Sequence, residues 1–155
     1  MKLIKLSNSS RRAKIDDCFF EEISKRGWFY HLGYARSHFK LGAMFKTGAM
    51  HRIILPPKKG FDIDHKNRNG LDNRRCNLRY ATRSQNLANS KLPVNNTSGF
   101  KGVRFEKDRG LWLARIKVNQ VTKNLGRYKN KIDAAKAYNA AAIKYFGEFS
   151  RINKL

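Results

Sequence analysis

The sequence predicts an α+β protein. A small N-terminal sheet is expected to lead into a ββα unit of strand, hairpin loop, short strand and helix, and a three-stranded antiparallel sheet packed on one helix should follow. Three observations predict this architecture: short β-type segments bounded by Gly, Pro and Asn, a Pro- and Asn-rich break at 91–98, and a late helical stripe. At 155 residues the chain can fold as one domain or as two or three small ones.

The N-terminal supporting region, residues 1–50, is predicted to be rich in β-structure. Alternating apolar and aromatic residues mark its strands, and Asn and Gly mark its turns. The expected elements are strands at 2–6 and 11–15, a helix at 16–25, and strands within 28–39 broken at Gly33. A further strand is expected at 51–55, just beyond this region. We therefore expect a small sheet that supports the next unit.

Residues 51–90 are expected to form the ββα unit. Asn69-Gly70 is a strong tight-turn signal, and Thr82-Arg-Ser-Gln85 has the spacing of a capping box that begins a helix. Asp64 and His65 fall in the first strand of the unit. Because successive strand residues point to opposite faces, both can serve one phosphate only at an irregular strand end.

Residues 91–98 are predicted to be a linker, and residues 99–155 a separate module. Eight extended residues span at most ~28 Å, so the two halves would act on one substrate. The strands should pair as an antiparallel meander, and the helix, striped at helical spacing and stopped by Gly147, should pack on it. The expected elements are strands at 99–106, 111–118 and 122–128 and a helix at 131–146.

The charge balance predicts a nucleic-acid partner, because 34 Lys and Arg residues against 11 Asp and Glu give a net charge of +23 and a pI near 10.6. A solvated basic face is the alternative interpretation. No apolar run approaches the ~20 residues that cross a bilayer, and the start lacks the apolar stretch of a signal peptide. Cys18 and Cys76 have no CxxC pairing, so we expect reduced thiols and no structural zinc.

Four side chains of the ββα unit could together hydrolyse a phosphodiester bond. The reaction needs a base that activates water, a cation that neutralises the developing charge, and a group that holds the base in the correct tautomer. Asp64, His65, Asn77 and Asn86 could fill these roles, because carboxylate and amide oxygens suit Mg²⁺ or Mn²⁺ and leave the imidazole as base. Each also has a structural interpretation, as a turn residue, a strand end or a surface residue.

The segment from about Met50 to Asn89 resembles the His-Asn-His (HNH) endonuclease family, particularly its phage and intron-encoded homing type. The resemblance rests on Asp64-His, Asn69-Gly, Asp72-Asn-Arg, Asn77-Leu-Arg, Thr82 and Asn86. It implies that Asp64 and Asn86 bind the metal, Mg²⁺ or else Mn²⁺. It also implies that His65 is the general base and that Asn77 orients it. The third motif position is Asn86 instead of histidine, a variant common in the homing branch.

Residues from about Ser98 to Asn153 resemble the APETALA-type DNA-binding domain of plant ethylene-response factors, which also occurs fused to phage nucleases. The resemblance rests on segments that begin Phe100-Lys-Gly-Val-Arg, Trp112-Leu-Ala-Arg, Asn124-Leu-Gly-Arg-Tyr and Ala134-Ala-Lys-Ala-Tyr. It implies that three strands lie in the DNA major groove with the helix behind them. Glu106, Asp108 and Asn124 depart from the plant pattern, so its base-reading code does not transfer.

Side chains in both halves are expected to contact DNA. Core packing is the alternative for the tryptophan among them, and a solvated rim is the alternative for the basic residues. His51 is interpreted as structural instead of as a phosphate contact, and His31 and His38 as surface or packing residues. The residues expected to contact DNA are Arg74, Arg75, Arg79, Lys101, Arg104, Trp112, Arg115, Lys117 and Arg127.

The predicted function is site-selective cleavage of double-stranded DNA by a monomer whose single active site nicks one strand. The alternatives are a non-catalytic, sequence-selective DNA-binding regulator and a defence or toxin nuclease that cuts unrelated sequences alike. A fused DNA-reading module favours a chosen site. The expected location is the cytoplasm, as a phage-encoded protein in a bacterial cell or at the host nucleoid.

Overall fold

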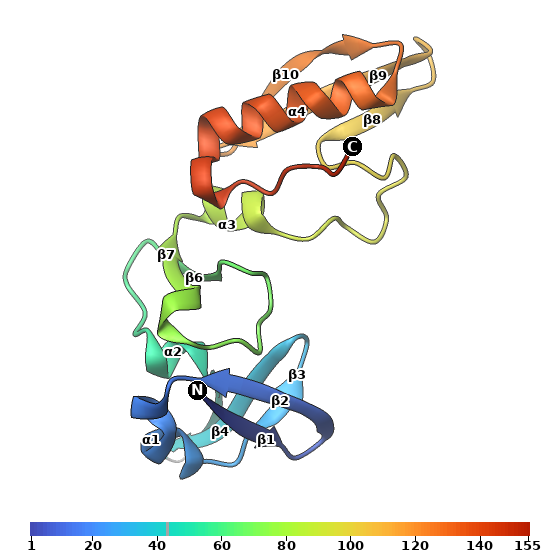
Figure 1. Ribbon diagram of the computed structural model, residues 1–155. Coiled ribbons are helices and arrows are strands. Elements are labelled where there is room, and N and C mark those ends of the chain that lie inside the picture. Colours follow the sequence, from blue (N-terminus) through green and yellow to red (C-terminus); the bar gives the residue numbers. More distant parts are fainter. Residues whose placement is uncertain (43) are drawn as a thin grey trace. The chain divides into compact units, whose positions relative to one another are not determined.

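The chain folds into two compact units, Met1–Ala81 and Thr82–Leu155. A computed structural model describes residues 1–42 and 44–155 (Figure 1). Each unit has hydrophobic clusters of its own. The division falls just before the helix of the expected ββα unit, whereas the sequence predicts the boundary at the 91–98 linker.

The first unit consists of small antiparallel sheets and short helices. In chain order the elements are β1 Lys2–Leu6, β2 Ser9–Ile15, η1 Asp17–Phe19, α1 Phe20–Ser24, β3 Phe29–His31, β4 Tyr34–Leu41, β5 Met44–Ala49, α2 His51–Ile54, β6 Asp62–His65, η2 Arg75–Asn77 and β7 Leu78–Ala81. β1 pairs with β2, β4 lies between β3 and β5, and β6 pairs with β7. The expected first strands, the helical segment after them and the break at Gly33 are confirmed; β5 was not expected.

The strand expected at 51–55 is wrong, because these residues form the helix α2. The backbone N–H groups of Ile53 and Ile54 both donate to the Met50 carbonyl. Met50 and Ile54 are buried at the i, i+4 spacing of one helix face. An apolar run this short fits a strand and a buried helix equally well by periodicity, and the core contacts decide between them.

The hairpin loop between β6 and β7 is attached to β2. The Lys14 N–H donates to the Leu71 carbonyl at 2.7 Å, and the Asn73 N–H donates to the Lys14 carbonyl at 2.8 Å. The loop therefore continues the ladder of the N-terminal strands for one short parallel step. Because both bonds are backbone bonds, the N-terminal sheet fixes the position of the loop that follows the Asp64-His65 pair.

The second unit is a three-stranded sheet covered by a long helix. Its elements are α3 Arg83–Asn89, β8 Val103–Glu106, β9 Leu111–Val118, β10 Val121–Tyr128, α4 Lys131–Phe146 and η3 Gly147–Phe149. The strand order is β10-β9-β8 and all pairs are antiparallel. Buried alanines and Tyr138 on α4 pack against Ala114 and Ile116 of β9. The expected meander and helix are confirmed, as is Gly147 at the end of α4 with a positive φ.

Helix α3 begins at the expected capping box and belongs to this second unit. The Thr82 hydroxyl accepts from the Gln85 N–H, and the Gln85 side chain accepts from the Thr82 N–H. Ala88 is buried in the same cluster as Ile116 and Tyr138, so α3 packs on the module that follows it. In the described part of the chain no helix has the length and apolarity that a bilayer span requires.

Candidate active site

Asp64 and His65 lie at the end of β6, where both side chains are buried. The ladder stays regular to the end of the strand, since Asp64 pairs with Arg79 and His65 with Leu78. Asp64 and His65 are the last two residues of the strand, and the negative charge of Asp64 acts on the His65 ring. The Arg79 Nε donates to the Asp64 Oδ2 at 2.9 Å, and only small fractions of both side chains are exposed. Arg79, expected to contact DNA, thus forms a buried ion pair with Asp64.

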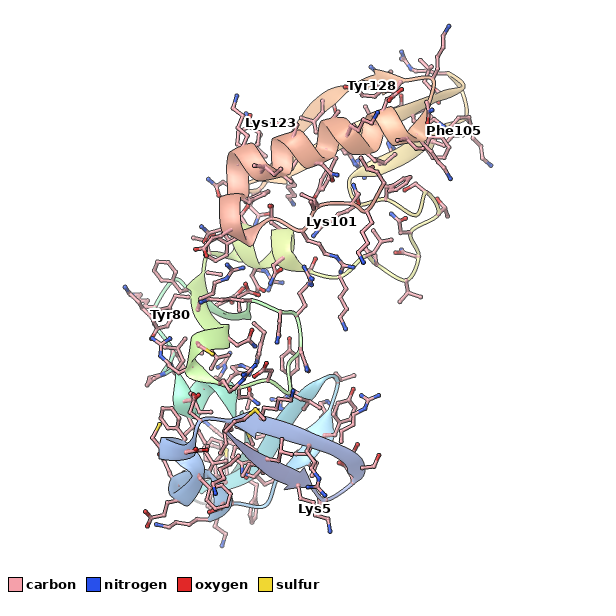
Figure 2. The ribbon with its side chains drawn as sticks, in the orientation of Figure 1. Lys5, Tyr80, Lys101, Phe105, Lys123 and Tyr128 are labelled. Carbon is pink, nitrogen blue, oxygen red and sulfur yellow. The ribbon has the colours of Figure 1, made fainter. Side chains whose placement is uncertain are left out.

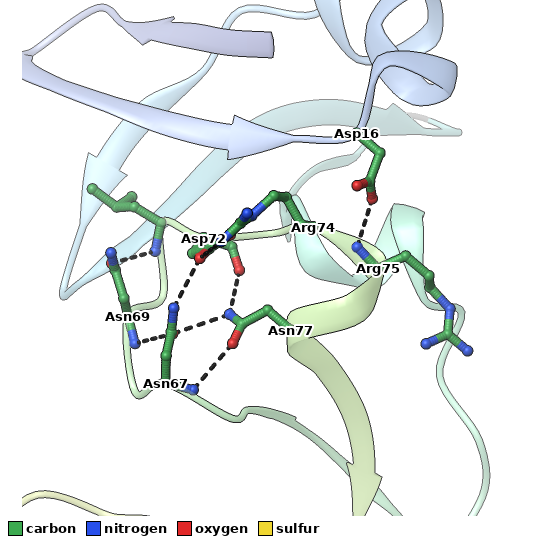
Figure 3. A network of polar contacts seen from close by, with 8 residues as sticks. Asp16, Asn67, Asn69, Asp72, Arg74, Arg75 and Asn77 are labelled. Atoms are coloured by element: carbon green, nitrogen blue, oxygen red, sulfur yellow. Dashed lines mark hydrogen bonds and ion pairs between the residues drawn. The ribbon is translucent and has the colours of Figure 1, made fainter. Parts of the chain in front are cut away.

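The loop after His65 is held by a network of amide and carboxylate side chains (Figure 3). Asn77 Nδ2 donates to Asn67 Oδ1 at 3.0 Å and to the Asp72 carbonyl at 2.7 Å, while the Asn67 N–H donates to Asn77 Oδ1 at 3.0 Å. Asn67 Nδ2 in turn donates to the Asp72 carboxylate at 2.8 Å. Asn77 therefore ties the start of the loop to its end, and none of these bonds reaches the imidazole that it was expected to orient.

Asp72 and Arg74 form the charged part of this network. Arg74 donates twice to Asp72, from Nε and Nη2, at 2.7 Å each. The guanidinium holds the pKa of the buried Asp72 carboxyl below its ordinary value. Arg74, also expected to contact DNA, is thus engaged in a bidentate ion pair inside the molecule. The Arg75 N–H donates to the Asp16 carboxylate at 2.6 Å, which caps η2 from the end of the N-terminal strands (Figure 3).

The His65 ring contacts the side chain of Asn73, which is completely buried. His65 Nε2 lies 3.2 Å from Asn73 Oδ1, and Asn73 Nδ2 donates to the Met50 sulfur at 3.4 Å. Burial lowers the pKa of His65, while the Asn73 contact and the charges of Asp64 and Asp72 oppose that effect. The imidazole is therefore neutral at pH 7 and is oriented by an amide.

Two further rings enclose His65. The His51 ring stands at right angles to it with centroids 5.1 Å apart, and the Tyr34 ring lies 5.8 Å away. His51 Nδ1 is buried without a hydrogen-bond partner in the described part of the chain. Burial, reinforced by the positive charges of neighbouring side chains, lowers the pKa of His51 to about 3, so this ring is also neutral. The prediction that His51 packs as a structural residue agrees with these contacts, although it lies on a helix.

The sequence predicts Asp64 and Asn86 as the metal ligands. Asp64 is a buried carboxylate near the end of β6, and Asn86 lies in the first turn of α3. Within the described residues, no cluster of three or more His, Cys, Asp or Glu side chains is arranged to hold a metal. The donor set of one carboxylate and one amide suits Mg²⁺ or Mn²⁺, which take their remaining ligands from water and phosphate.

Comparison with known proteins bears on this geometry. A family model described as HNH endonuclease matches residues 55–88, which contain Asp64, His65, Asn77 and Asn86. An uncharacterised HNH endonuclease of Acanthamoeba polyphaga mimivirus is 33% identical over 136 residues, which cover 86% of this chain and 70% of that protein. The chain belongs to the HNH endonuclease family. It is therefore a DNA endonuclease, a hydrolase of phosphodiester bonds, from a family whose members generally use a divalent metal.

A second relative matches a shorter part of this HNH endonuclease. Protein 3.8 of Escherichia phage T7 is 41% identical over 61 residues, which are 39% of this chain and 50% of that protein. Half of the phage protein lies outside the match.

In the second unit of the HNH endonuclease, the face of the sheet away from α4 is basic. Cross-strand pairing places Arg104, Arg115, Lys117 and Arg127 on this face, and all four are exposed. Glu106 stands between Arg104 and Arg127 and accepts from them at 3.0 and 2.7 Å. These four residues, all expected to contact DNA, therefore share one surface. Glu106, which departs from the plant pattern, bridges Arg104 and Arg127.

Two other residues expected to contact DNA, Lys101 and Trp112, make contacts within the protein. The Lys101 ammonium donates to the carbonyls of Leu87, Ala88 and Ser90, at 2.8, 2.5 and 3.1 Å, and so closes the C-terminal end of α3 (Figure 2). Trp112 lies on the helix side of the sheet, where it packs against the cluster of Val103 and Ala114 and against the Phe105 ring at 4.9 Å. Neither side chain projects from the basic face.

The sequence interpretation missed the residues that touch the His65 ring. Asn73 stands in the Asp72-Asn-Arg motif, so a signal was present, but the motif assigns no role to its middle residue. Tyr34 and His51 come from distant segments, and no local pattern connects them with His65. Gly70 has a role different from the expected turn geometry. A Cβ there would lie 2.5 Å from the Gly33 carbonyl oxygen and 2.6 Å from the Tyr34 ring, so close packing requires the glycine.

Proposed function

We propose that this HNH endonuclease cleaves double-stranded DNA with His65 as the general base and with a divalent cation, Mg²⁺ or Mn²⁺, bound by Asp64 and Asn86. The observation that carries the proposal is the His65 imidazole, which is buried, neutral at pH 7 and in contact with an amide oxygen. A neutral imidazole can accept a proton from water, and a fixed ring orientation is what a general base needs.

The contacts of Asn73 favour one nitrogen of the His65 ring as the base. A thioether can accept a hydrogen bond and cannot donate one, so the Asn73 amide N–H₂ faces the Met50 sulfur and the amide oxygen faces His65. The Asn73 oxygen then accepts the proton of His65 Nε2. The lone pair of the neutral ring is consequently on Nδ1, which would take the proton of the attacking water. Asn73 is a positioning residue in this mechanism.

Asp64 and Asn86 would hold the cation through oxygen atoms. When bound, the cation would neutralise the charge that develops on the phosphate and on the leaving oxygen. The ion pair with Arg79 fixes the orientation of the Asp64 carboxylate before substrate arrives. Asn86 lies in the first turn of a helix whose start is fixed by the Thr82 capping box.

The second unit would select the site of cleavage. Its face of Arg104, Arg115, Lys117 and Arg127 is a basic β surface, and a β element fits the major groove of B-DNA. A nuclease joined to such a surface would cut near a chosen sequence, as in homing. With a single His65 in each chain, a monomer would nick one strand.

Supercoiled plasmid tests this mechanism. We expect conversion to the relaxed circle with Mg²⁺ and none with EDTA, and we expect His65→Ala to abolish nicking while binding a DNA duplex in EDTA with unchanged affinity. An unchanged thermal unfolding curve is the control for folding, because His65 lies in the core region of the first unit. Nicking that survives His65→Ala at the wild-type rate would refute His65 as the base.

The rival functions predict different products. A DNA-binding regulator would retain one duplex selectively and give no relaxed circle at any Mg²⁺ or Mn²⁺ concentration. A general nuclease would relax plasmids of unrelated sequence and leave nicks at many positions. Sequencing of the nicked strand in several plasmids distinguishes these outcomes, and nicks confined to one position support site selection by the second unit.

A further inference from the structure

The β4–β5 hairpin of the first unit has one exposed face of cationic and aromatic side chains. Cross-strand partners share a face, and the register pairs Arg36 with Ala49, His38 with Thr47, and Lys40 with Phe45. Tyr34 joins them, because every second residue of a strand points to the same side. We refer to the surface made by Tyr34, Arg36, His38, Lys40, Phe45 and Thr47 as the ribbon face.

The ribbon face points away from the core of the first unit. The intervening residues Ala35 and Ser37 are 1% and 4% exposed, so the other face of β4 is buried near the start of the strand. On the ribbon face, Tyr34 is 41% and Phe45 71% exposed, and His38, Lys40 and Thr47 are also exposed. The far part of the ribbon face is therefore open to solvent, whereas Arg36 is half-buried.

The chemistry of the ribbon face fits a polyanion. Residues 23–61 contain no Asp or Glu and eight Lys and Arg residues, so no carboxylate in this stretch neutralises the cations of the face. The Lys40 ammonium lies 5.4 Å from the centre of the Phe45 ring, and His38 stacks on Phe29 at 4.7 Å. Cations alternating with exposed rings are typical of surfaces that bind nucleic acid.

The ribbon face is continuous with the surroundings of His65. The Tyr34 ring lies 5.8 Å from the His65 ring and 5.5 Å from the His51 ring. Next along β4, the Arg36 Nε is buried without a hydrogen-bond acceptor in the described residues. The positive charge of this guanidinium acts on the His51 ring, so the basic character of the ribbon face extends to the surroundings of His65.

The shape of the hairpin selects duplex DNA. β3 pairs only with residues 34–36 of β4, so beyond Arg36 the hairpin is a two-stranded ribbon. The major groove of B-DNA admits such a ribbon. From Tyr34 to Lys40 the strand is ~20 Å long, which is the length of about six base pairs.

We propose that the ribbon face binds the DNA duplex within about six base pairs of the scissile phosphate, on the side of the cleavage site next to Tyr34. This proposal rests on the proposed function, because His65 marks the scissile phosphate. Lys40 contacts a phosphate, and Phe45 contacts the groove beside it. The contact belongs to the first unit and is additional to that of the basic face of the β8–β10 sheet.

Two lysines of the same hairpin give a matched test. Lys40 lies on the ribbon face and Lys46 lies on the opposite face, paired with Phe39. Lys40→Gln and Lys46→Gln remove the same charge from the same hairpin, so unfolding or a general loss of charge affects both alike. The measurement is the dissociation constant of a random-sequence duplex at several salt concentrations in EDTA.

We expect Lys40→Gln to weaken binding and to reduce the slope of log K against log salt by about 0.9, the value for one phosphate contact. We expect Lys46→Gln to leave the slope unchanged. Equal slopes for the two variants would overturn the proposal. The assay contains no divalent metal, so its result does not depend on nicking. It therefore distinguishes a failure of the ribbon-face proposal from a failure of the proposed nuclease function.

A photo-crosslinker locates the contact. Benzoylphenylalanine at Phe45, on the ribbon face, should form a covalent adduct with duplex DNA, while the same group at Phe39, on the opposite face, should not. Equal yields from the two positions would contradict the proposal. On a plasmid with a mapped nick, adducts from position 45 more than one helical turn from the nick would show that the surface binds elsewhere on the duplex.

Discussion

Replacement of Asn73 by alanine tests the link between the buried amide and the base. In the folded protein Asn73 is fully buried, and its oxygen faces His65 Nε2 at 3.2 Å. Asn73→Ala removes the acceptor that faces a buried ring N–H, which costs about 2 kcal/mol of unfolding free energy. In a unit of this size that loss lowers the Tm by about 8–16 °C. Without the acceptor the ring can take either tautomer, so we expect kcat to fall about 100-fold, or about 2.7 kcal/mol, with KM unchanged.

The assay is plasmid nicking at a temperature where thermal unfolding shows the variant to be folded, with kcat and KM separated by varying the plasmid concentration. Asn73→Asp is the matched control, because a carboxylate oxygen in the same place still accepts from Nε2. We expect this variant to be more active than Asn73→Ala. If Asn73→Ala keeps the wild-type kcat, or if both variants lose activity equally, the assignment of the lone pair to His65 Nδ1 is wrong.

Three further predictions concern other side chains. His51→Phe should lower the free energy of unfolding by less than about 1.4 kcal/mol and keep kcat within tenfold, because a ring of similar volume still packs on His65. His51→Ala should lower both the Tm and kcat, and an equal loss from the two variants would show that the imidazole itself is needed. The low pKa of the Asp72 carboxyl contributes stability at neutral pH, and this stability is lost as the pH falls below 3.8, the ordinary pKa of the group. In urea unfolding, Asp72→Asn should therefore be less stable than wild type at pH 7, and the difference in unfolding free energy should be much smaller at pH 2.5. The same difference at both pH values would contradict the ion pair with Arg74. Lys117→Gln should reduce the salt slope of duplex binding by about 0.9, while Lys101→Gln should lower the Tm and leave the slope unchanged; the reverse result would place Lys101 on the DNA surface.

Local signals in the sequence predicted most of the elements. The Thr82 capping box, the even spacing of three β segments and the stripe of α4 each depend on residues close together in the chain, and the structure contains all three features. The break at Gly33 is likewise a local property, since the glycine takes a positive φ that other residues disfavour. Such signals are reliable because short-range hydrogen bonds and backbone preferences decide them.

Features that depend on distant contacts could not be predicted. Whether residues 51–55 form a strand or a helix depends on how Met50 and Ile54 meet the core. The partner of His65 depends on the path of the loop, which backbone bonds to Lys14 fix from the N-terminal sheet. α3 was expected to belong with β6 and β7 because they are adjacent in sequence, but Ala88 is buried in the cluster of Tyr138. These outcomes follow from packing, which a pattern within one segment does not encode.

The scarcity of acidic residues helps to separate structural cations from those available to DNA. With 34 Lys and Arg residues against 11 Asp and Glu, most cations cannot be paired within the protein. Arg79 and Arg74, both expected to bind DNA, instead meet Asp64 and Asp72 and shape the site. A buried carboxylate beside an arginine therefore predicts a structural role for that arginine, because its loss would leave a charge unpaired in the interior. By the same reasoning, a long stretch without acidic residues, such as 23–61, is where contacts with an external polyanion are expected, and the ribbon face lies within it.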